Sequence, residues 1–386
     1  MQTINPKLLS WSVDTDPGTI KQAEKTARLP IISGHVSLMP DAHVGLGATV
    51  GSVIATENAV IPAAVGVDLG CGMIAVRTDL RGGDLPQSLN RLLDGIEANV
   101  PSGVGRAHRE ATPAADAWFA AHRHPTGLDD RMTRDARMQF GTLGSGNHFV
   151  EVCLDNDGGR VWVVLHSGSR GVGNKLASRH IKVAKALARE AGTPLEDPDL
   201  AWFQAATPEF DAYIADMHWA QEYALGNREA MMDAVLAVLF AAVGHGAEVQ
   251  RINCHHNFCQ REHHGGNDVW VTRKGAIKAS TGMLGVIPGS MGTRSYIVRG
   301  LGNPLSWESC SHGAGRSMSR IEARRRFTAA DLAQQMEGKT WLSGRAKALV
   351  DEIPQSYKDI DRVMDAQRDL VEVVCELRQV LNYKGT

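Results

Sequence analysis

Gly66-Val67-Asp68-Leu69-Gly70-Cys71-Gly72-Met73-Ile74-Ala75-Val76 joins a glycine-rich turn directly to an apolar, β-like stretch. This pattern predicts a strand that begins at a functional turn, with Asp68 and Cys71 close together in that turn. A tight turn can direct both side chains at one ion, and a carboxylate with a thiolate suits a divalent transition metal better than magnesium or calcium. The alternative is a buried structural cysteine beside a turn aspartate, because free cysteine is commonly a small buried apolar residue.

A second glycine-rich segment, residues 141–152, leads into another predicted strand. Alternation along this strand places His148 and Val150 on one face, and it places Asn147, Phe149 and Glu151 on the other. His148 could therefore be a metal ligand, or it could be a core histidine bonded to a backbone carbonyl.

Residues 161–165 are all apolar and predict a buried strand that ends at His166. The strand is followed by Ser167-Gly168-Ser169-Arg170-Gly171. A histidine at the end of an apolar strand, ahead of serine and arginine, is typical of a metal ligand beside an anion site. The alternative for His166 is again a core histidine with a backbone partner.

Residues 252–258 contain two adjacent histidines, His255 and His256. On a strand or bend they would point in opposite directions, so only one of them can bind a given ion. Before this pair, the apolar periodicity predicts helices at 174–191, 209–225 and 228–249, whose Met and Leu stripes indicate core packing.

Ser309-Cys310-Ser311-His312-Gly313-Ala314-Gly315-Arg316 places a histidine among small residues that let a backbone approach a ligand closely. The arginine four positions later could meet negative charge. Histidine can act as a nucleophile towards phosphorus as well as a base or a ligand, although most histidines in such loops have no covalent role. Because several other segments carry metal-type ligands, we interpret His312 as the reacting group that they surround.

The five candidate ligands could hold two ions that share a bridging thiolate: Asp68, Cys71, His148, His166 and His256. Mixed nitrogen, sulfur and oxygen donors favour manganese, iron, cobalt or zinc. A metal bound there would contact phosphate oxygens and stabilise the charge that develops during attack at phosphorus. The sequence contains neither Lys-x-Asp-Gly nor a Gly-x-x-x-x-Gly-Lys-Ser/Thr loop, so a lysine nucleophile and a P-loop both lack a candidate.

The overall composition is that of an ordinary soluble globular protein. The chain has 386 residues, of which 43% are hydrophobic, enough for a substantial core. Its net charge of −2 gives no global basic field of the kind that indicates nucleic acid, although a local groove could still be positive. Without a signal pattern or an apolar run of about 18 residues, we expect a cytoplasmic protein that does not contact the membrane. Six cysteines without the spacing of a disulfide scaffold predict reduced thiols.

We expect one domain over residues 1–386, because no repeat, low-complexity segment or linker interrupts the chain. Residues 85–140 are polar and partly helical, with helices predicted at 88–96, 113–122 and 129–137 and with Thr112 as a cap. This segment is predicted to be a peripheral layer in which His108, His122 and His124 lie in solvent. The expected fold class is α+β, with a mixed β-sheet core, peripheral helices and a cleft lined by glycine-rich loops.

Nearly the whole chain resembles the RtcB family of RNA-splicing ligases, so an RtcB-like fold is expected. The resemblance rests on Met39-Pro40-Asp41-Ala42-His43, Gly66-Val67-Asp68-Leu69-Gly70-Cys71-Gly72, Gly146-Asn147-His148-Phe149-Val150-Glu151, His166-Ser167-Gly168-Ser169-Arg170-Gly171, His255-His256-Asn257 and Ser311-His312-Gly313-Ala314-Gly315-Arg316. It implies GTP- and Mn²⁺-dependent joining of an RNA 3′-phosphate or 2′,3′-cyclic phosphate to a 5′-hydroxyl. The implied intermediates are a guanylylated histidine and RNA-(3′)pp(5′)G. The implied role is tRNA splicing or RNA repair, on tRNA halves or nicked RNA, with an archease-type activator as a possible partner.

The resemblance also implies a role for each matching residue. His312 would take GMP from GTP, and the five candidate ligands would hold two Mn²⁺ ions with Cys71 bridging them. Tyr357 would lie against the guanine, Lys384 would bind its edge, and Arg170 would contact an RNA phosphate. The remaining implied guanylate contacts are Asn147, His148, Phe149, Val150, Glu151, His256, Asn257, Pro288, Gly289, Ser290, Met291, Ser295, Gly313, Ala314 and Gly315. Family members tend to finish on Lys-Gly, whereas this chain continues to Thr386.

Two other classes of function are compatible with the same residues. A dinuclear metal-dependent phosphoesterase acting on RNA ends would use the ligands to activate water and His312 as a general acid. A non-catalytic RNA-binding protein with a structural metal is the other, but structural sites are closed by four ligands and do not need several glycine loops around the ion.

Overall fold

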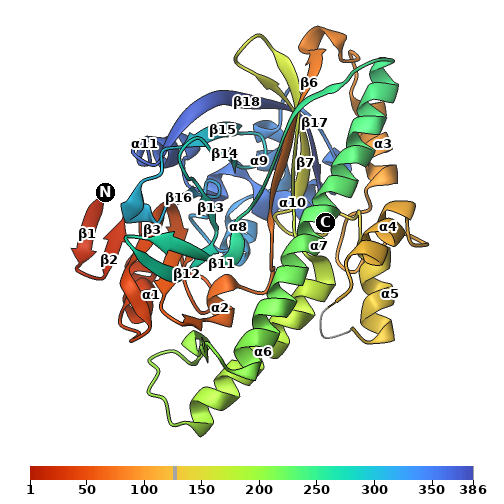
Figure 1. The fold of residues 1–386 in the computed structure, drawn as a ribbon. Coiled ribbons are helices and arrows are strands. Elements are labelled where there is room, and N and C mark those ends of the chain that lie inside the picture. The colour runs from red at the N-terminus through yellow and green to blue at the C-terminus, as the bar shows by residue number, and fades with distance from the viewer. Residues whose placement is uncertain (125–127, 386) are drawn as a thin grey trace.

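A computed structural model describes residues 1–124 and 128–385, which form two large β-sheets with helices packed outside them (Figure 1). In the six-stranded sheet β2 and β3 are parallel, and the other pairs are antiparallel. Its strands are, in spatial order, β1 (Gln2–Asn5), β2 (Leu8–Ser10), β3 (Ile32–His43), β4 (Val50–Thr56), β12 (Asn267–Lys274) and β11 (Asn257–His264).

The eight-stranded sheet is also mixed, since β17 pairs in parallel with β18 whereas the other pairs are antiparallel. Its two outer strands, β10 and β14, lie against each other, so the sheet curves into a near-barrel. The strands are, in spatial order, β10 (Glu248–His255), β6 (Gly72–Arg81), β8 (Arg160–Ser167), β7 (Phe149–Asp155), β18 (Val371–Lys384), β15 (Arg294–Gly300) and β14 (Leu284–Pro288), with β17 (Thr340–Trp341) beside β18.

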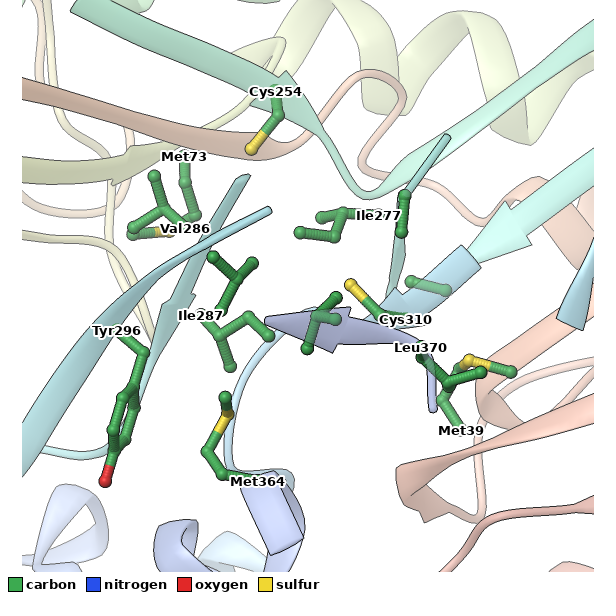
Figure 2. Close-up of a cluster of buried hydrophobic side chains, with 14 of the residues drawn as sticks. Met39, Met73, Cys254, Ile277, Val286, Ile287, Tyr296, Cys310, Met364 and Leu370 are labelled. Carbon is green, nitrogen blue, oxygen red and sulfur yellow. The ribbon is translucent and has the colours of Figure 1, made fainter. Parts of the chain in front are cut away.

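Side-chain alternation along β6 and β8 builds two different cores on the two faces of this sheet. Met73 of β6 and Val164 of β8 enter the core between the two sheets, part of which is drawn in Figure 2. Ile74 and Leu165 instead enter a core that packs against helices. His166 follows Leu165, so the alternation directs it into the space between the sheets, as the predicted buried strand requires.

Helix α7 (Pro208–Val243) covers the outer face of the eight-stranded sheet together with α3 (Asn90–Asn99). Helix α6 (Arg170–Glu190) lies along α7, and α4 (Pro113–Ala121) and α5 (Asp130–Gln139) form the layer beyond them (Figure 1). The other helices are α1 (Pro17–Ala27), α2 (Pro62–Val65), α8 (Arg320–Arg326), α9 (Ala329–Gln335), α10 (Ala346–Leu349), α11 (Ile360–Asp365) and the short 3₁₀ turns η1 (Gly82–Asp84), η2 (Pro198–Leu200), η3 (Pro304–Ser306), η4 (Ser343–Arg345), η5 (Val350–Glu352) and η6 (Pro354–Ser356). The remaining strands are β5 (Ala59–Val60), β9 (Phe203–Gln204), β13 (Ala276–Lys278) and β16 (Ser309–Ser311).

None of the helices within 1–124 and 128–385 combines the length and apolarity needed to cross a membrane.

The prediction of separate helices at 209–225 and 228–249 was wrong. The structure has one uninterrupted helix, α7, and residues 248 and 249 already belong to β10. Gly226 does not break the helix; it makes room for neighbours, since a Cβ there would lie 2.6 Å from Nε1 of Trp118 and 3.1 Å from Cζ of Phe140. Close packing against aromatic rings therefore accounts for this glycine.

The three helices predicted within 85–140 are confirmed as α3, α4 and α5, and Thr112 caps α4 by accepting a hydrogen bond from the Ala115 amide. Residues 125–127 of this segment lie outside the described residues. The prediction that His108, His122 and His124 lie in solvent was wrong, since all three are partly buried and Nε2 of His108 lies 3.2 Å from the Gly141 carbonyl. The ring of His122 stacks on Trp118 at 4.4 Å, and Nε2 of His124 lies 3.5 Å from the buried carboxylate of Asp216.

Candidate active site

A cavity of about 330 Å³ lies where strands of both sheets end, a volume typical of a small-ligand site. One wall carries candidate metal ligands and His312, and the opposite wall carries cationic side chains. Its lining residues are His43, Val50, Gly66, Val67, Asp68, Cys71, Met73, Asn147, Phe149, Glu151, His166, His256, Asn257, Lys274, Gly275, Pro288, Gly289, Ser290, Met291, His312, Gly313, Ala314, Gly315, Arg316, Arg320, Tyr357 and Lys384.

The structure brings together all five candidate ligands, hereafter the ligand cluster. They form two overlapping groups, Asp68 with Cys71 and His148, and Cys71 with His166 and His256, and the ligand atoms of each group lie within 4.8 Å of one another. Sγ of Cys71 is 3.2 Å from Nε2 of His166 and 3.5 Å from Nε2 of His148. Because Cys71 belongs to both groups, its Sγ is the atom that two neighbouring ions could share.

Hydrogen bonds at Nδ1 fix which nitrogen of each histidine faces the cluster. Nδ1 of His148 is 2.9 Å from the Leu143 carbonyl, and Nδ1 of His166 is 3.0 Å from the Asn147 carbonyl. A carbonyl can only accept, so each Nδ1 carries a proton, and each Nε2 faces the cluster, where it presents a lone pair when the ring is neutral. A backbone acceptor on the far nitrogen is the arrangement usual for metal-binding histidines.

His166 and His256 provide the clearest indication of a cation. Nδ1 of His256 lies 3.3 Å from Oδ1 of Asn257, an oxygen that also accepts from the Gly275 amide. Nδ1 of His256 therefore carries the proton, and its Nε2 also presents a lone pair. This Nε2 lies only 2.8 Å from Nε2 of His166. Two lone pairs cannot bond to each other, so the donor set fits a shared positive ion.

Burial controls the protonation of the ligand cluster. It lowers the pKa of His166 and of His256 well below the usual value, and the other histidines lower both further. Burial and then the Asp68 carboxylate raise the pKa of the Cys71 thiol. Burial opposes ionisation of Asp68, but the hydrogen bond and charge of His148 lower the pKa of Asp68 overall. At neutral pH the imidazoles of His166 and His256 are thus neutral and ready to bind metal, whereas the Cys71 thiol must first lose its proton.

The turn predicted between Asp68 and Cys71 is confirmed, since the Cys71 amide donates to the Asp68 carbonyl at 3.2 Å. Gly70 has a φ of +70°, and a Cβ there would lie 2.7 Å from Cα of Gln221 on α7. The turn therefore requires glycine for both backbone conformation and space.

The adjacent histidines point in opposite directions, as predicted. His256 joins the ligand cluster, whereas Nδ1 of His255 lies 2.8 Å from the Gly70 carbonyl. Burial, and then the charge of Arg228, lowers the pKa of His255 to about 3. His255 therefore supports the turn that carries Cys71.

His312 lies directly after β16, with its ring 4.7 Å from that of His256. Its Nδ1 is 2.6 Å from Oδ2 of Asp41, and its backbone amide donates to the same oxygen at 3.2 Å. Asp41 is fully buried in β3. Asp41 belongs to one motif of the resemblance, but no role was predicted for it; an aspartate within the apolar stretch Leu38-Met39-Pro40-Asp41-Ala42 was the available signal.

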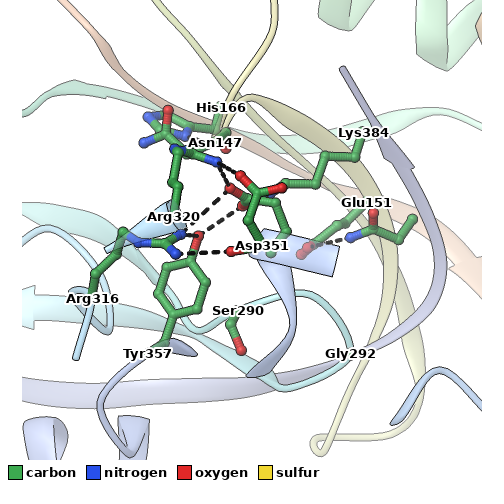
Figure 3. Close-up of polar contacts among 12 residues, drawn as sticks. Asn147, Glu151, His166, Ser290, Gly292, Arg316, Arg320, Asp351, Tyr357 and Lys384 are labelled. Carbon is green, nitrogen blue, oxygen red and sulfur yellow. Dashed lines mark hydrogen bonds and ion pairs between the residues drawn. The ribbon is translucent and has the colours of Figure 1, made fainter. Parts of the chain in front are cut away.

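The opposite wall is organised around the buried carboxylate of Glu352, which the sequence analysis missed. Nζ of Lys384 is 2.7 Å from its Oε2, the Tyr357 hydroxyl donates to the same oxygen at 2.7 Å, and Arg320 pairs with Oε1. Figure 3 shows Arg320 and Tyr357 beside Asp351, with Lys384 reaching in from β18. Burial opposes ionisation of Glu352, but Lys384 and Arg320 lower its pKa overall.

Glu151 is the other buried acid of the cavity. Asn382 donates to its Oε1 at 2.9 Å, whereas Oε2 has no hydrogen-bond partner among the residues that the structure describes. Burial raises the pKa of Glu151 to about 8, although Lys384 and Asn382 act in the opposite direction. Oε2 of Glu151 is therefore available to a ligand in the cavity, and it becomes an acceptor when the carboxyl ionises.

Four of the residues implied by the resemblance do not line the cavity: His148, Val150, Arg170 and Ser295. Val150 packs into the core beneath α7, and Ser295 is fully buried in β15. Nε of Arg170 donates to the Thr142 hydroxyl at 3.1 Å, and burial lowers the pKa of its guanidinium. His148 belongs to the ligand cluster, and every other predicted site residue lines the cavity.

Comparison with known proteins gives a consistent result over the full length. The family model described as tRNA-splicing ligase RtcB matches residues 22–122 and 116–385. The RNA-splicing ligase RtcB of Escherichia coli is 43% identical over 411 residues, which cover 100% of this chain and 99% of the relative. The tRNA-splicing ligase RtcB of Aeropyrum pernix is 31% identical over 420 residues, covering 89% and 86%. The RNA-splicing ligase RtcB of Mycobacterium tuberculosis is 30% identical over 434 residues, covering 94% and 100%.

Proposed function

The chain belongs to the RtcB family of tRNA-splicing ligases, and we propose that it joins RNA 3′-phosphate or 2′,3′-cyclic phosphate ends to 5′-hydroxyl ends using GTP. One observation carries the proposal: His312 stands in the same cavity as the ligand cluster, with Nδ1 against the buried carboxylate of Asp41. A neutral histidine held in this way presents its other nitrogen, Nε2, as a nucleophile.

In the first step, His312 attacks the α-phosphorus of GTP, and the bond from that phosphorus to the β-phosphate oxygen breaks with release of pyrophosphate. The product is a phosphoramidate on His312, which conserves energy for a second transfer. Asp41 orients the ring and stabilises the positive charge that develops on it during attack.

In the second step, an oxygen of the RNA 3′-phosphate attacks the guanylylated His312 and takes the GMP group, which regenerates the free histidine. A 2′,3′-cyclic phosphate is first opened by water. In the third step, the 5′-hydroxyl attacks the RNA 3′-phosphorus, GMP leaves, and the hydroxyl proton is released. Arg316 and Arg320 line the cavity and can bind the phosphates that take part.

The ligand cluster would hold two divalent ions, for which Mn²⁺ suits the mixed donor set. Bound there, they would supply Lewis-acid stabilisation of the charge on the reacting phosphate. The guanine would lie near Tyr357 and Lys384, with Glu151 accepting from its edge, and the glycine-rich loops at 66, 289 and 313–315 would let the nucleotide approach the backbone.

The first test is incubation with Mn²⁺ and GTP labelled in turn at the α- and γ-phosphate, followed by denaturation. We expect the protein to retain the α-label alone, to lose it in acid and to keep it in base. The His312→Ala variant should retain none, whereas His245→Ala, at an exposed position, should label normally. Absence of retained label, together with metal-dependent phosphate release from RNA ends, would instead establish the phosphoesterase.

The resemblance further implies tRNA halves or damaged RNA as substrates and an archease-type activator. Joining assays with defined RNA ends, with and without that activator, would test both parts of the proposal.

A further inference from the structure

The middle of α7 carries two adjacent polar residues that the reaction above does not use. Asn227 and Arg228 are both fully buried, and Arg228 and Arg273 are the largest side chains in that state among the described residues. Arg228 forms no ion pair with a carboxylate in the described part of the chain, and the adjacent Glu229 pairs with Arg251 instead. Burying a guanidinium without a counter-charge is costly unless its donors bind other groups.

Arg228 donates hydrogen bonds to backbone carbonyls beside the ligand cluster. NH1 donates to the Gly70 carbonyl at 2.8 Å and to the Ser167 carbonyl at 3.1 Å. Gly70 directly precedes Cys71, and Ser167 directly follows His166. One guanidinium nitrogen therefore links the two chain segments that present Cys71 and His166.

The same side chain also reaches β10, which ends at His255 directly before His256. Nε of Arg228 donates to Oδ1 of Asn253 at 2.8 Å, and NH2 lies 3.2 Å from Nδ1 of His255. Because His255 is the neighbour of His256, Arg228 contacts the backbone or side chains next to three of the five members of the ligand cluster.

Asn227 links the loop that presents His148 to the same region. Its Oδ1 accepts from the Gly141 amide at 2.7 Å, and its Nδ2 donates to the Gly168 carbonyl at 3.1 Å. Gly168 is two residues beyond His166, and residues 141–147 form the loop that leads into His148. The amide thus joins the loop before β7 to the loop after β8.

We propose that Asn227 and Arg228 are positioning residues that hold the loops of the ligand cluster at the separation required for metal binding. This inference rests on the proposed function, because it assumes that the ligand cluster binds a divalent metal. The uninterrupted helix α7 also contributes to this positioning, because it carries both residues. A rigid helix can fix several loops at once, and Gly226 lets it approach Trp118 closely.

The experiment is a titration of each purified variant with Mn²⁺, in which the free ion is followed by its electron paramagnetic resonance signal. For Asn227→Leu and Arg228→Met we expect Mn²⁺ affinity to fall by about 10- to 100-fold, the range typical when partners of metal ligands are lost. The Mn²⁺ affinity of Arg228→Lys should lie in between, because an ammonium can replace NH1 at the two carbonyls but cannot also replace the hydrogen bond from Nε to Asn253. Arg228→Lys also supplies the test if the more drastic variants fail to fold.

The matched control is Leu239→Ala, which creates a cavity in the core under the same helix, away from the ligand cluster. It should lower the melting temperature and leave Mn²⁺ affinity unchanged. For Arg228→Lys, the Mn²⁺ concentration that gives half-maximal GTP labelling should rise, while maximal labelling at saturating Mn²⁺ is retained.

If wild-type protein binds Mn²⁺ and Arg228→Lys and Asn227→Leu bind it equally well, the inference is wrong and the two residues serve stability alone. If the wild-type protein itself binds no divalent metal in the titration, the proposed metal site fails, and this inference fails with it. The two failures are distinguished by the wild-type titration.

Discussion

Nδ1 of His312 lies 2.6 Å from Oδ2 of Asp41, although 271 positions separate the two residues in the chain. Replacing Asp41 by Asn keeps the size of the side chain but removes the negative charge that stabilises the imidazolium developing on His312. An amide can also turn its NH₂ towards Nδ1, which favours the wrong tautomer of His312. We expect the Asp41→Asn variant to lose about 10²- to 10⁴-fold in the initial rate of α-labelling from GTP.

The control for this prediction is Asp94→Asn, which alters an exposed carboxylate on α3. Melting temperatures of both variants should be recorded, because Asp41 is buried and its loss can also cost stability. A labelling rate for folded Asp41→Asn within threefold of wild type would show that Asp41 does not assist His312.

Local patterns in the sequence predicted the parts of the site that local chemistry determines. The apolar run 161–165 predicted a buried strand that ends at His166, and the glycine-flanked turn placed Asp68 beside Cys71. The adjacent pair His255 and His256 followed from the geometry of a strand alone. Such features depend on residues that are neighbours in the chain, so a single sequence contains them.

Contacts between distant segments were not accessible in this way. No local sequence pattern distinguishes Glu352. Its place in the site depends on β18, which brings Lys384 to its carboxylate. The predicted gap between the helices 209–225 and 228–249 falls on Gly226 and Asn227, and both residues are poor helix formers in isolation. Packing of Trp118 against Gly226 and the hydrogen bonds of Asn227 override that local preference.

Removal of the metal should lower the stability of the protein. A ligand at 100 times its dissociation constant stabilises the folded state by about 2.7 kcal/mol, so Mn²⁺ should raise the melting temperature by a few degrees relative to a chelator-treated sample. The rise should be smaller at pH 5.5 than at pH 7.5, because binding must displace the proton of the Cys71 thiol, whose pKa is raised by burial. Differential scanning calorimetry with and without Mn²⁺ at both pH values measures this.

Cys71→Ser should abolish the Mn²⁺-dependent rise in melting temperature, since Cys71 belongs to both groups of the ligand cluster. Cys375→Ser changes a buried cysteine outside the cavity and should keep the rise. An equal rise in both variants would contradict a bridging role for Cys71.

GTP binding should depend on pH through Glu151. Burial raises the pKa of Glu151 to about 8, so the carboxyl is mostly protonated at pH 7. In the folded protein, the stability contributed by the neutral acid is fully present below the unfolded pKa near 4.5 and is lost as the pH rises through about 8. If the carboxylate form accepts the N–H groups of guanine, affinity for GTP should increase by up to about tenfold per pH unit between pH 6.5 and 8.

Equilibrium binding of a non-hydrolysable GTP analogue across this range measures the effect, and Glu151→Gln should remove most of the slope. A slope that is unchanged in Glu151→Gln would assign the pH dependence to another group.

Lys384 should determine the preference for guanine over adenine. Strand β18 pairs with β7 so that Lys384 lies opposite Phe149, which fixes the lysine in the cavity wall, while Thr386 lies outside the described residues. An ammonium can donate to the O6 acceptor of guanine, whereas adenine presents an amino group at that position. A hydrogen bond to a charged group contributes about 1.5–3 kcal/mol, so Lys384→Met should reduce the ratio of kcat/KM for GTP over ATP by about 10- to 100-fold. Lys347→Met, at an exposed position on α10, should leave the ratio unchanged. If Lys384→Met weakened labelling by both nucleotides equally, the lysine would act only through its ion pair with Glu352, and another group would select the base.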